Sequence, residues 1–171
     1  MQPHSLIRAT SLSDAEAVAT LYRAAGQSGS GLARTPDEVT LDYVTQFLEA
    51  SLDGGLALVV VDDDAVIAEI HARLLHPRTF SHILGDLTIA VHPSHQGRGI
   101  GRGLFREFLG RVTDDMPHIL RVELYAREGN THAIGMYESI GFQKEGRMVK
   151  RVRLPDGTLD NDIPMAWLRD R

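Results

Sequence analysis

The residues best placed to do chemistry lie in a turn with glycine at every second position: Gly97, Gly99, Gly101 and Gly103. An apolar strand pattern precedes the turn, and a helical pattern follows it directly. Glycine has no Cβ, so backbone N–H groups there can approach a ligand closely, and the N-terminus of a helix favours an anion. The turn therefore predicts a binding site for the phosphate groups of a cofactor.

Two common phosphate motifs do not fit this turn. The dinucleotide pattern G-x-G-x-x-G fails because Arg102 or Leu104 stands where the third glycine should be, counting from Gly97 or Gly99. The P-loop pattern fails because no Gly-Lys-Ser or Gly-Lys-Thr occurs in the chain. What remains is Gln-x-x-Gly-x-Gly, over residues 96–101.

A second motif begins at Asn130 and has the form N-x-x-A-x-x-x-Y-x-x-x-G-F, with Ala133, Tyr137 and Gly141-Phe142 at its later positions. Ala133 and Tyr137 are four residues apart, so they share one face of a helix. Alone, this stripe would indicate core packing. In this order, the two motifs resemble those of the GCN5-related N-acetyltransferases.

This resemblance covers the order of elements from residue 5 onward and is most specific over residues 84–146. It implies an α/β (α+β) fold of the acyl-CoA N-acyltransferase type, in a single domain over residues 1–171. The expected architecture is a mixed seven-stranded sheet with about four helices and a splayed central strand pair.

The resemblance also implies acetyl-CoA as co-substrate and no metal. Ile89 and Val91 would offer backbone groups to the pantetheine arm, and Asn130 and Ala133 would lie at the cofactor. The residues implied at the pyrophosphate are those of the turn: Gln96, Gly97, Arg98, Gly99, Gly101 and Arg102.

Acetyl transfer to an amine requires a neutral amine, a polarised carbonyl group and a proton for the leaving thiolate. The Val91 N–H is expected to stabilise the developing oxyanion. Tyr137 is expected to donate a proton to the thiolate, although a purely structural aromatic residue would fit the same position.

Asp86 is the first choice for the group that accepts the proton of the amine. It begins the cofactor strand and shares a face with Thr88. A solvated strand end, or a partner for a nearby arginine, is the alternative. Glu69, His71 and Glu123 on neighbouring strands are other candidates, and a chain of waters is also open.

Composition limits the remaining classes. The chain has 171 residues, a net charge of −5 and no cysteine, which argues against general nucleic-acid binding and excludes disulfides and thiolate chemistry. The N-terminus has no apolar signal core, and no apolar run approaches the length of a membrane span. We therefore expect a soluble, cytoplasmic protein. His92-x-x-His95 and Asp62-Asp63-Asp64 are expected to be surface residues rather than metal ligands.

The remaining patterns predict the elements that position these residues. Capping boxes at Ser13-Asp14-Ala15-Glu16 and Thr35-Pro36-Asp37-Glu38 predict the starts of two helices, joined by a flexible loop over residues 27–34. Further helices are expected over residues 99–112 and 131–140. The expected strands are 5–9, 56–61, 65–75, 84–91, 119–126, 142–154 and 159–168.

Three functions stay open at this point. The first is N-acetyl transfer to a small-molecule amine or a protein N-terminus. The others are a catalytically silent acyl-CoA sensor and a transferase that uses another acyl donor, such as succinyl-CoA, or a hydroxyl acceptor. Family members often form homodimers, so a homodimer is one candidate assembly.

Overall fold

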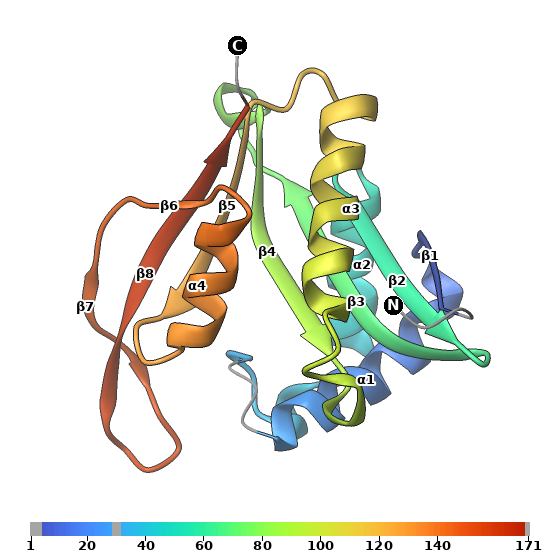
Figure 1. The fold of residues 1–171 in the computed structure, drawn as a ribbon, viewed down its shortest axis with the longest axis horizontal. Helices are drawn as coiled ribbons and strands as arrows, with labels where there is room; N and C mark the ends of the chain where they lie inside the picture. Colours follow the sequence, from blue (N-terminus) through green and yellow to red (C-terminus); the bar gives the residue numbers. More distant parts are fainter. Residues whose placement is uncertain (1–4, 29–31, 170–171) are drawn as a thin grey trace.

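The computed structural model describes residues 5–28 and 32–169, so residues 29–31 of the expected loop lie outside the described residues (Figure 1). The described chain forms one sheet of eight strands in the order β1-β2-β3-β4-β5-β8-β6, with β7 paired to β8. The strands are β1 Leu6–Ala9, β2 Leu56–Asp62, β3 Ala65–Leu74, β4 Ile83–Val91, β5 Arg121–Arg127, β6 Gln143–Lys144, β7 Met148–Arg153 and β8 Leu159–Leu168.

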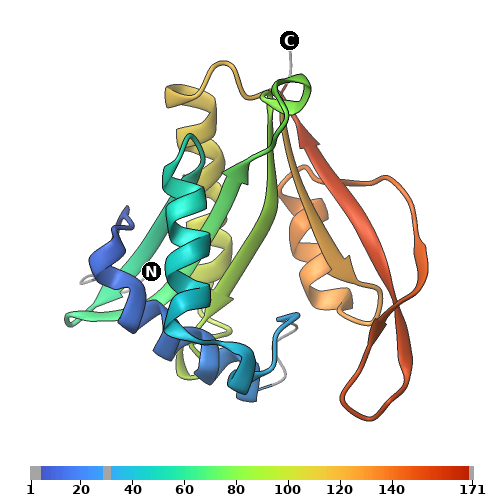
Figure 2. The same ribbon diagram turned by 180° about the vertical axis from the view of Figure 1, so that it is seen from behind.

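Helices cover both faces of the sheet. In Figure 1, α3 and α4 lie in front of the strands, and the reverse view in Figure 2 brings α1 and α2 to the front. The helices are α1 Ala15–Gln27, α2 Leu41–Leu52, α3 Ile100–Asp115 and α4 Thr131–Ser139. The fold is thus the expected mixed α/β arrangement.

Strand alternation builds a separate apolar core on each face. On β3, Ala68 and Ile70 belong to the core beneath α3. The residues between and after them, Glu69 and His71, are also buried, and they face α1 and α2 instead. Two titratable side chains therefore occupy positions that a strand normally gives to apolar residues.

The central strands β4 and β5 form the one parallel pair among the described strands, and they pair over a short distance. The register joins Ile83 to Arg121 and Leu84 to Val122, and the pairing then stops. Figure 1 shows the two strands close at one end and apart at the other. The expected splayed pair is present.

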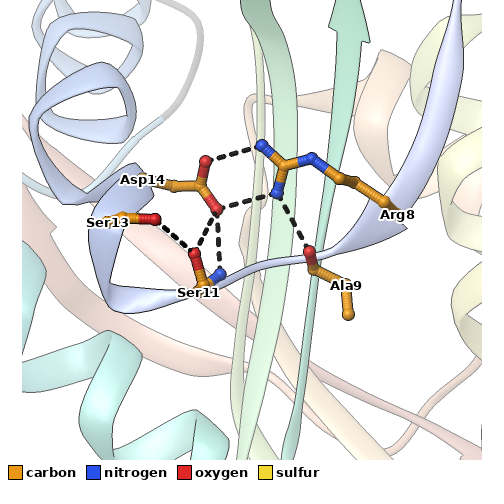
Figure 3. Close-up of polar contacts among 5 residues, drawn as sticks. All are labelled: Arg8, Ala9, Ser11, Ser13 and Asp14. Atoms are coloured by element: carbon orange, nitrogen blue, oxygen red, sulfur yellow. Dashed lines mark hydrogen bonds and ion pairs between the residues drawn. The ribbon is translucent and has the colours of Figure 1, made fainter.

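The first helix begins differently from the prediction. The carboxylate of Asp14, rather than that of Glu16, reaches back to the chain and accepts the Ser11 N–H at 2.9 Å (Figure 3). Arg8 holds the same carboxylate with two bonds, of 2.7 and 2.8 Å. Because Asp14 is fixed in this way, a 3₁₀ turn over Leu12–Asp14 precedes α1.

The second capping box also opens a 3₁₀ turn rather than the helix. The Glu38 carboxylate accepts the Thr35 N–H at 2.9 Å, and the turn covers Pro36–Glu38. The helix α2 starts later, where the Thr40 hydroxyl accepts the Tyr43 N–H at 3.1 Å. The predicted capping box is therefore present, but it caps the 3₁₀ turn, and the N-cap of α2, Thr40, lies five residues after Thr35.

The strand expected over residues 142–154 is divided into β6 and β7, which gives eight strands instead of seven. The segment between them turns its charged side chains to other elements. Glu145 pairs with Arg121 of β5, and Arg147 pairs with Glu128 at 2.6 Å. The Glu145 N–H still donates to the Pro164 carbonyl of β8 at 2.9 Å, and pairing with β8 resumes at Met148.

Candidate active site

The edge of β4 that faces β5 carries free backbone groups. The His92 N–H donates to the Ile67 carbonyl on the β3 side at 2.8 Å. Successive residues of a strand bond alternately to its two neighbours, so the backbone groups of Ile89 and Val91 point towards β5. Because β4 and β5 pair only at the other end of the strand, these groups have no β5 partner.

The glycine turn continues directly from this edge. The Gln96 side chain donates to the Val91 carbonyl at 3.1 Å and so fixes the turn against the end of β4. Gly97 and Gly99 have φ angles of 74° and 77°, which glycine adopts without strain. A Cβ built on either glycine would meet no atom within 4 Å. The turn therefore leaves an open cradle lined by backbone.

This cradle lies at the N-terminus of a long helix. Gly99 is the N-cap of α3, and the helix begins at Ile100. Gly101 packs closely, since a Cβ there would lie 3.4 Å from Val91 Cγ2. Arg98 and Arg102 are exposed on the turn and the first helical turn. Free N–H groups, the helix dipole and two guanidinium groups fit a pyrophosphate group.

Tyr137 on α4 lies on the same side of the sheet. Its ring centroid is 5.5 Å from that of Phe105 and 6.1 Å from that of Phe142. Burial raises the pKa of Tyr137 to about 12. Its hydroxyl has no hydrogen-bond partner among residues 5–28 and 32–169. The residue is thus a packed aromatic with a protonated, uncommitted hydroxyl at neutral pH.

Asn130 and Ala133 start the helix that carries this tyrosine. The Asn130 side-chain oxygen accepts the Ala133 N–H at 3.2 Å and caps α4. The conformation of the second motif therefore has a local physical cause, and the asparagine side-chain oxygen is committed to the cap.

A cavity of about 370 Å³ opens on the opposite face of the sheet, between α2 and the strands β3 and β4. Its aromatic and charged lining residues are Arg34, Tyr43, Phe47, His71, Arg73 and Asp86, and Thr88 adds a hydroxyl. Two of the candidates for the proton acceptor, Asp86 and His71, therefore face one space.

Asp86 reaches the cavity because of a bulge in the pairing of β3 and β4. The register shifts between His71 and Arg73, and Asp86 has a φ angle of 53°. Bulges of this kind redirect side chains and are common beside active sites. The Asp86 carboxylate accepts a hydrogen bond from Arg73 Nε at 2.5 Å. Asp86 thus has the arginine partner that the sequence analysis gave as the alternative to a role as proton acceptor.

Glu69 and His71 form a buried network with Tyr22 of α1. The Tyr22 hydroxyl donates to Glu69 Oε2 at 2.7 Å, and His71 Nδ1 lies 3.1 Å from the same oxygen. Burial and the adjacent Glu69 carboxylate raise the pKa of Tyr22 well above its usual value. The contact of Tyr22 with these two β3 residues is not among the expectations from the sequence. Tyr22 and Glu69 are 47 residues apart in the sequence, so no local pattern indicates the contact.

The fourth candidate, Glu123, is engaged elsewhere. It accepts a hydrogen bond from Arg121 Nε at 2.8 Å within β5. It is not among the residues that line the cavity. The structure therefore brings together Asp86, His71 and Glu69, and leaves Glu123 apart.

The described residues contain neither a metal-binding cluster nor a helix that could span a membrane. Residues 5–28 and 32–169 contain no group of three or more His, Asp or Glu side chains arranged to hold a metal ion. Among the helices of the same residues, none combines the length and apolar character that crossing a membrane requires.

Comparison with known proteins gives a family match. The model of the acetyltransferase (GNAT) family matches residues 18–142, which include the β4 edge, the glycine turn and Tyr137. The matched region covers well over half of the chain.

Curated relatives match over shorter stretches. The N-alpha-acetyltransferase RimI of Mycobacterium tuberculosis is 44% identical over 59 residues, which are 34% of this chain and 34% of that protein. The mycothiol acetyltransferase of Salinispora tropica is 31% identical over 97 residues, which are 56% of this chain and 31% of that protein. The match thus spans about a third of the length of these relatives.

A solved structure matches over nearly the whole fold. The phosphinothricin acetyltransferase of Sinorhizobium meliloti, solved in complex with acetyl-CoA, superposes with a TM-score of 0.82 and 20% identity. The superposition covers 96% of this chain and 88% of that one. At this identity the likeness shows that the two proteins share a fold.

Proposed function

Because this chain belongs to the acetyltransferase (GNAT) family, we propose that it transfers an acetyl group from acetyl-CoA to the primary amine of a small molecule. The observation that carries the proposal is the continuous surface formed by the free edge of β4 and the glycine turn. Ile89 and Val91 direct backbone groups to the gap beside β5, and Gln96 joins this edge to the N-terminus of α3.

The proposed acetyl-CoA site runs along this surface. The edge groups of Ile89 and Val91 would hold the pantetheine arm as a neighbouring strand would. The turn would hold the pyrophosphate through its N–H groups, with Arg98 and Arg102 beside it: Gln96, Gly97, Arg98, Gly99, Gly101 and Arg102. Acetyl-CoA, when bound, supplies the activated acetyl thioester.

Two groups of the chain suit the developing charges. The N–H of Val91 lies on the free edge and would stabilise negative charge on the acetyl oxygen. Tyr137 would give a proton to the departing sulfur, because its hydroxyl is protonated at neutral pH and has no other partner among the described residues.

Asp86 is proposed as the residue that meets the acceptor. Its carboxylate faces the cavity and would attract the ammonium form of an amine. The Asp86 carboxylate already binds one cationic group, the guanidinium of Arg73. Asp86 therefore suits the binding of a cation better than the removal of its proton.

The cavity volume of about 370 Å³ suits a small-molecule acceptor. A protein N-terminus is the second candidate, favoured by the match to the N-alpha-acetyltransferase RimI. Only the first residues of a peptide would need to enter such a cavity, so both acceptor classes belong in one assay.

The test is amine-dependent release of CoA from acetyl-CoA, followed with a thiol reagent. The absence of cysteine removes any background from the protein itself. Small amines, amino acids and peptides with different N-termini are the acceptors, and succinyl-CoA is the parallel donor. A thermal shift with CoA but no release with any acceptor would favour the silent sensor. No thermal shift with acetyl-CoA or CoA would contradict the proposed site.

A further inference from the structure

His71 lines the acceptor cavity, and the buried Glu69 lies directly behind it. Glu69 has no exposed surface, and His71 is 5% exposed. A carboxylate in such a position is costly unless hydrogen bonds stabilise it. Here it accepts one from Tyr22 and lies within bonding distance of His71 Nδ1. The buried carboxylate of Glu69 therefore has hydrogen-bond partners on both sides, Tyr22 and His71.

The outer end of the network is the other ring nitrogen of His71. Among residues 5–28 and 32–169, Nε2 has no hydrogen-bond partner. The two buried side-chain atoms without a partner lie elsewhere, on Thr10 and Arg127, so Nε2 keeps contact with solvent. Since His71 lines the cavity, its free nitrogen is available to a molecule bound there.

The ring of His71 is held in one orientation. Phe47 of α2 stacks on it with a centroid distance of 4.0 Å and an interplanar angle of 13°. The titratable and charged groups around it come from each packed element: Tyr22 of α1, Arg34 before α2, Tyr43 of α2, Glu69 and Arg73 of β3, and Asp86 of β4. Of these, Glu69 and Tyr22 contact the ring nitrogen Nδ1 directly.

This arrangement differs from that of Asp86 in one respect. The Asp86 side chain is 59% exposed and already paired with Arg73. His71 has its inner nitrogen engaged by a carboxylate, and its outer nitrogen is free. A carboxylate behind an imidazole fixes the tautomer and stabilises the protonated ring, which is the requirement for a base that takes up a proton.

We propose that His71 is the catalytic residue that accepts the proton of the acceptor ammonium, and that Glu69 is the positioning residue behind it. The assignment rests on the proposed function, since it requires an amine in the cavity. The N–H bond of the ammonium breaks, the proton goes to His71 Nε2, and the electron pair stays on the amine nitrogen. His71 then releases its proton to solvent, and no oxidant or reductant is involved.

The experiment compares four variants with the parent over a range of pH. In His71→Gln, kcat should fall by about 10² or more, and the acidic limb of the kcat profile should disappear. In Glu69→Gln, kcat should fall while KM for the amine stays constant, because the carboxylate no longer fixes the orientation and tautomer of the ring. In Asp86→Asn the limb should remain. His118→Gln, at an exposed histidine beyond α3, is the matched control and should behave as the parent.

Two further measurements separate a chemical role from damage to the fold. Each variant should keep the thermal shift that acetyl-CoA gives the parent; if His71→Gln does not, His71→Asn takes its place. Among the imidazole resonances of histidine-labelled protein, one should be absent in the His71 variant, and in the parent this resonance should shift when an amine is added.

The possible outcomes distinguish failure of the proposed function from failure of the His71 assignment. A parent that releases no CoA with any amine contradicts the proposed function, and the His71 assignment with it. A parent that turns over, with His71→Gln equal to it, contradicts the His71 assignment alone. Loss of the acidic limb in Asp86→Asn but not in His71→Gln transfers the proton acceptor to Asp86.

Discussion

The carboxylate of Asp86 lies 2.5 Å from the Nε atom of Arg73, across the bulge that joins β3 to β4. Both side chains are partly exposed and both line the acceptor cavity. An exposed ion pair contributes little to folding stability, so its removal should leave a folded protein. The pair is thus open to a direct functional test.

Asp86→Asn should raise KM for a cationic amine by about 10-fold, because a charge attraction worth about 1.4 kcal/mol is lost. The value of kcat should change little. Arg73→Gln is the opposite control: it frees the carboxylate and should lower KM for the same amine. Steady-state kinetics at several salt concentrations measure both. A fall in kcat for Asp86→Asn with unchanged KM would show that Asp86 acts in the chemical step.

Gly99→Val should weaken CoA binding by at least 10-fold. The new side chain would occupy the open cradle and would adopt a φ of 77° only with strain. Gly157→Val is the matched control, because Gly157 has a φ of 83° and open space around its Cβ in the distant β7–β8 turn. Calorimetric titration with CoA measures both. Equal affinities in the two variants would mean that the turn only connects β4 to α3.

Tyr137→Phe removes one hydroxyl and little volume. Turnover should fall by about 10² while the affinity for acetyl-CoA stays constant, since the aromatic packing on Phe105 and Phe142 is retained. Because the pKa of Tyr137 is raised to about 12, the phenol stays protonated through the working range. No alkaline limb below about pH 9 should therefore belong to it. An unchanged rate would leave Tyr137 with a packing role.

Asp14→Asn should lower the free energy of unfolding at neutral pH by about 1–2 kcal/mol, allowing for the partial exposure of Arg8. The hydrogen bonds from Arg8 lower the pKa of Asp14 from 3.8 to about 2. The native state thus holds the charged form more strongly than the unfolded chain does. The contribution is complete above about pH 4 and is lost as pH falls towards 2. Urea titrations of parent and variant should converge over that interval.

The sequence carries the cofactor half of the site more clearly than the acceptor half. Glycine spacing and the preceding strand predict the turn at residues 96–101 because backbone geometry there is a local property. The fold class can be predicted for the same reason, because the hydrophobic periodicity of strands and helices is also a local property of the sequence. The two misplaced helix starts arise where Arg8 and Thr40, both outside the expected capping boxes, decide the outcome.

The acceptor cavity depends on contacts between distant segments. Tyr22 and Glu69 are 47 residues apart, and nothing in either local pattern indicates that the hydroxyl meets the carboxylate. Likewise, the Asp86 bulge comes from a register shift between two strands. Pair contacts of this kind follow from tertiary packing, and single-sequence patterns do not contain them.

The parting of β4 from β5 also has a consequence for the mechanics of the sheet. β4 and β5 share two register pairs at one end, and beyond them the facing edges of the two strands are unpaired. The N-terminal and C-terminal portions of the sheet are therefore joined by these two pairs and by side-chain packing such as that of Phe105 on Phe142. Such a seam is the part of a sheet where local opening costs least. Amide protons of Ile89 and Val91 should exchange fastest among the β4 residues in the free protein. A ligand lying in the seam would act as an added strand and slow them.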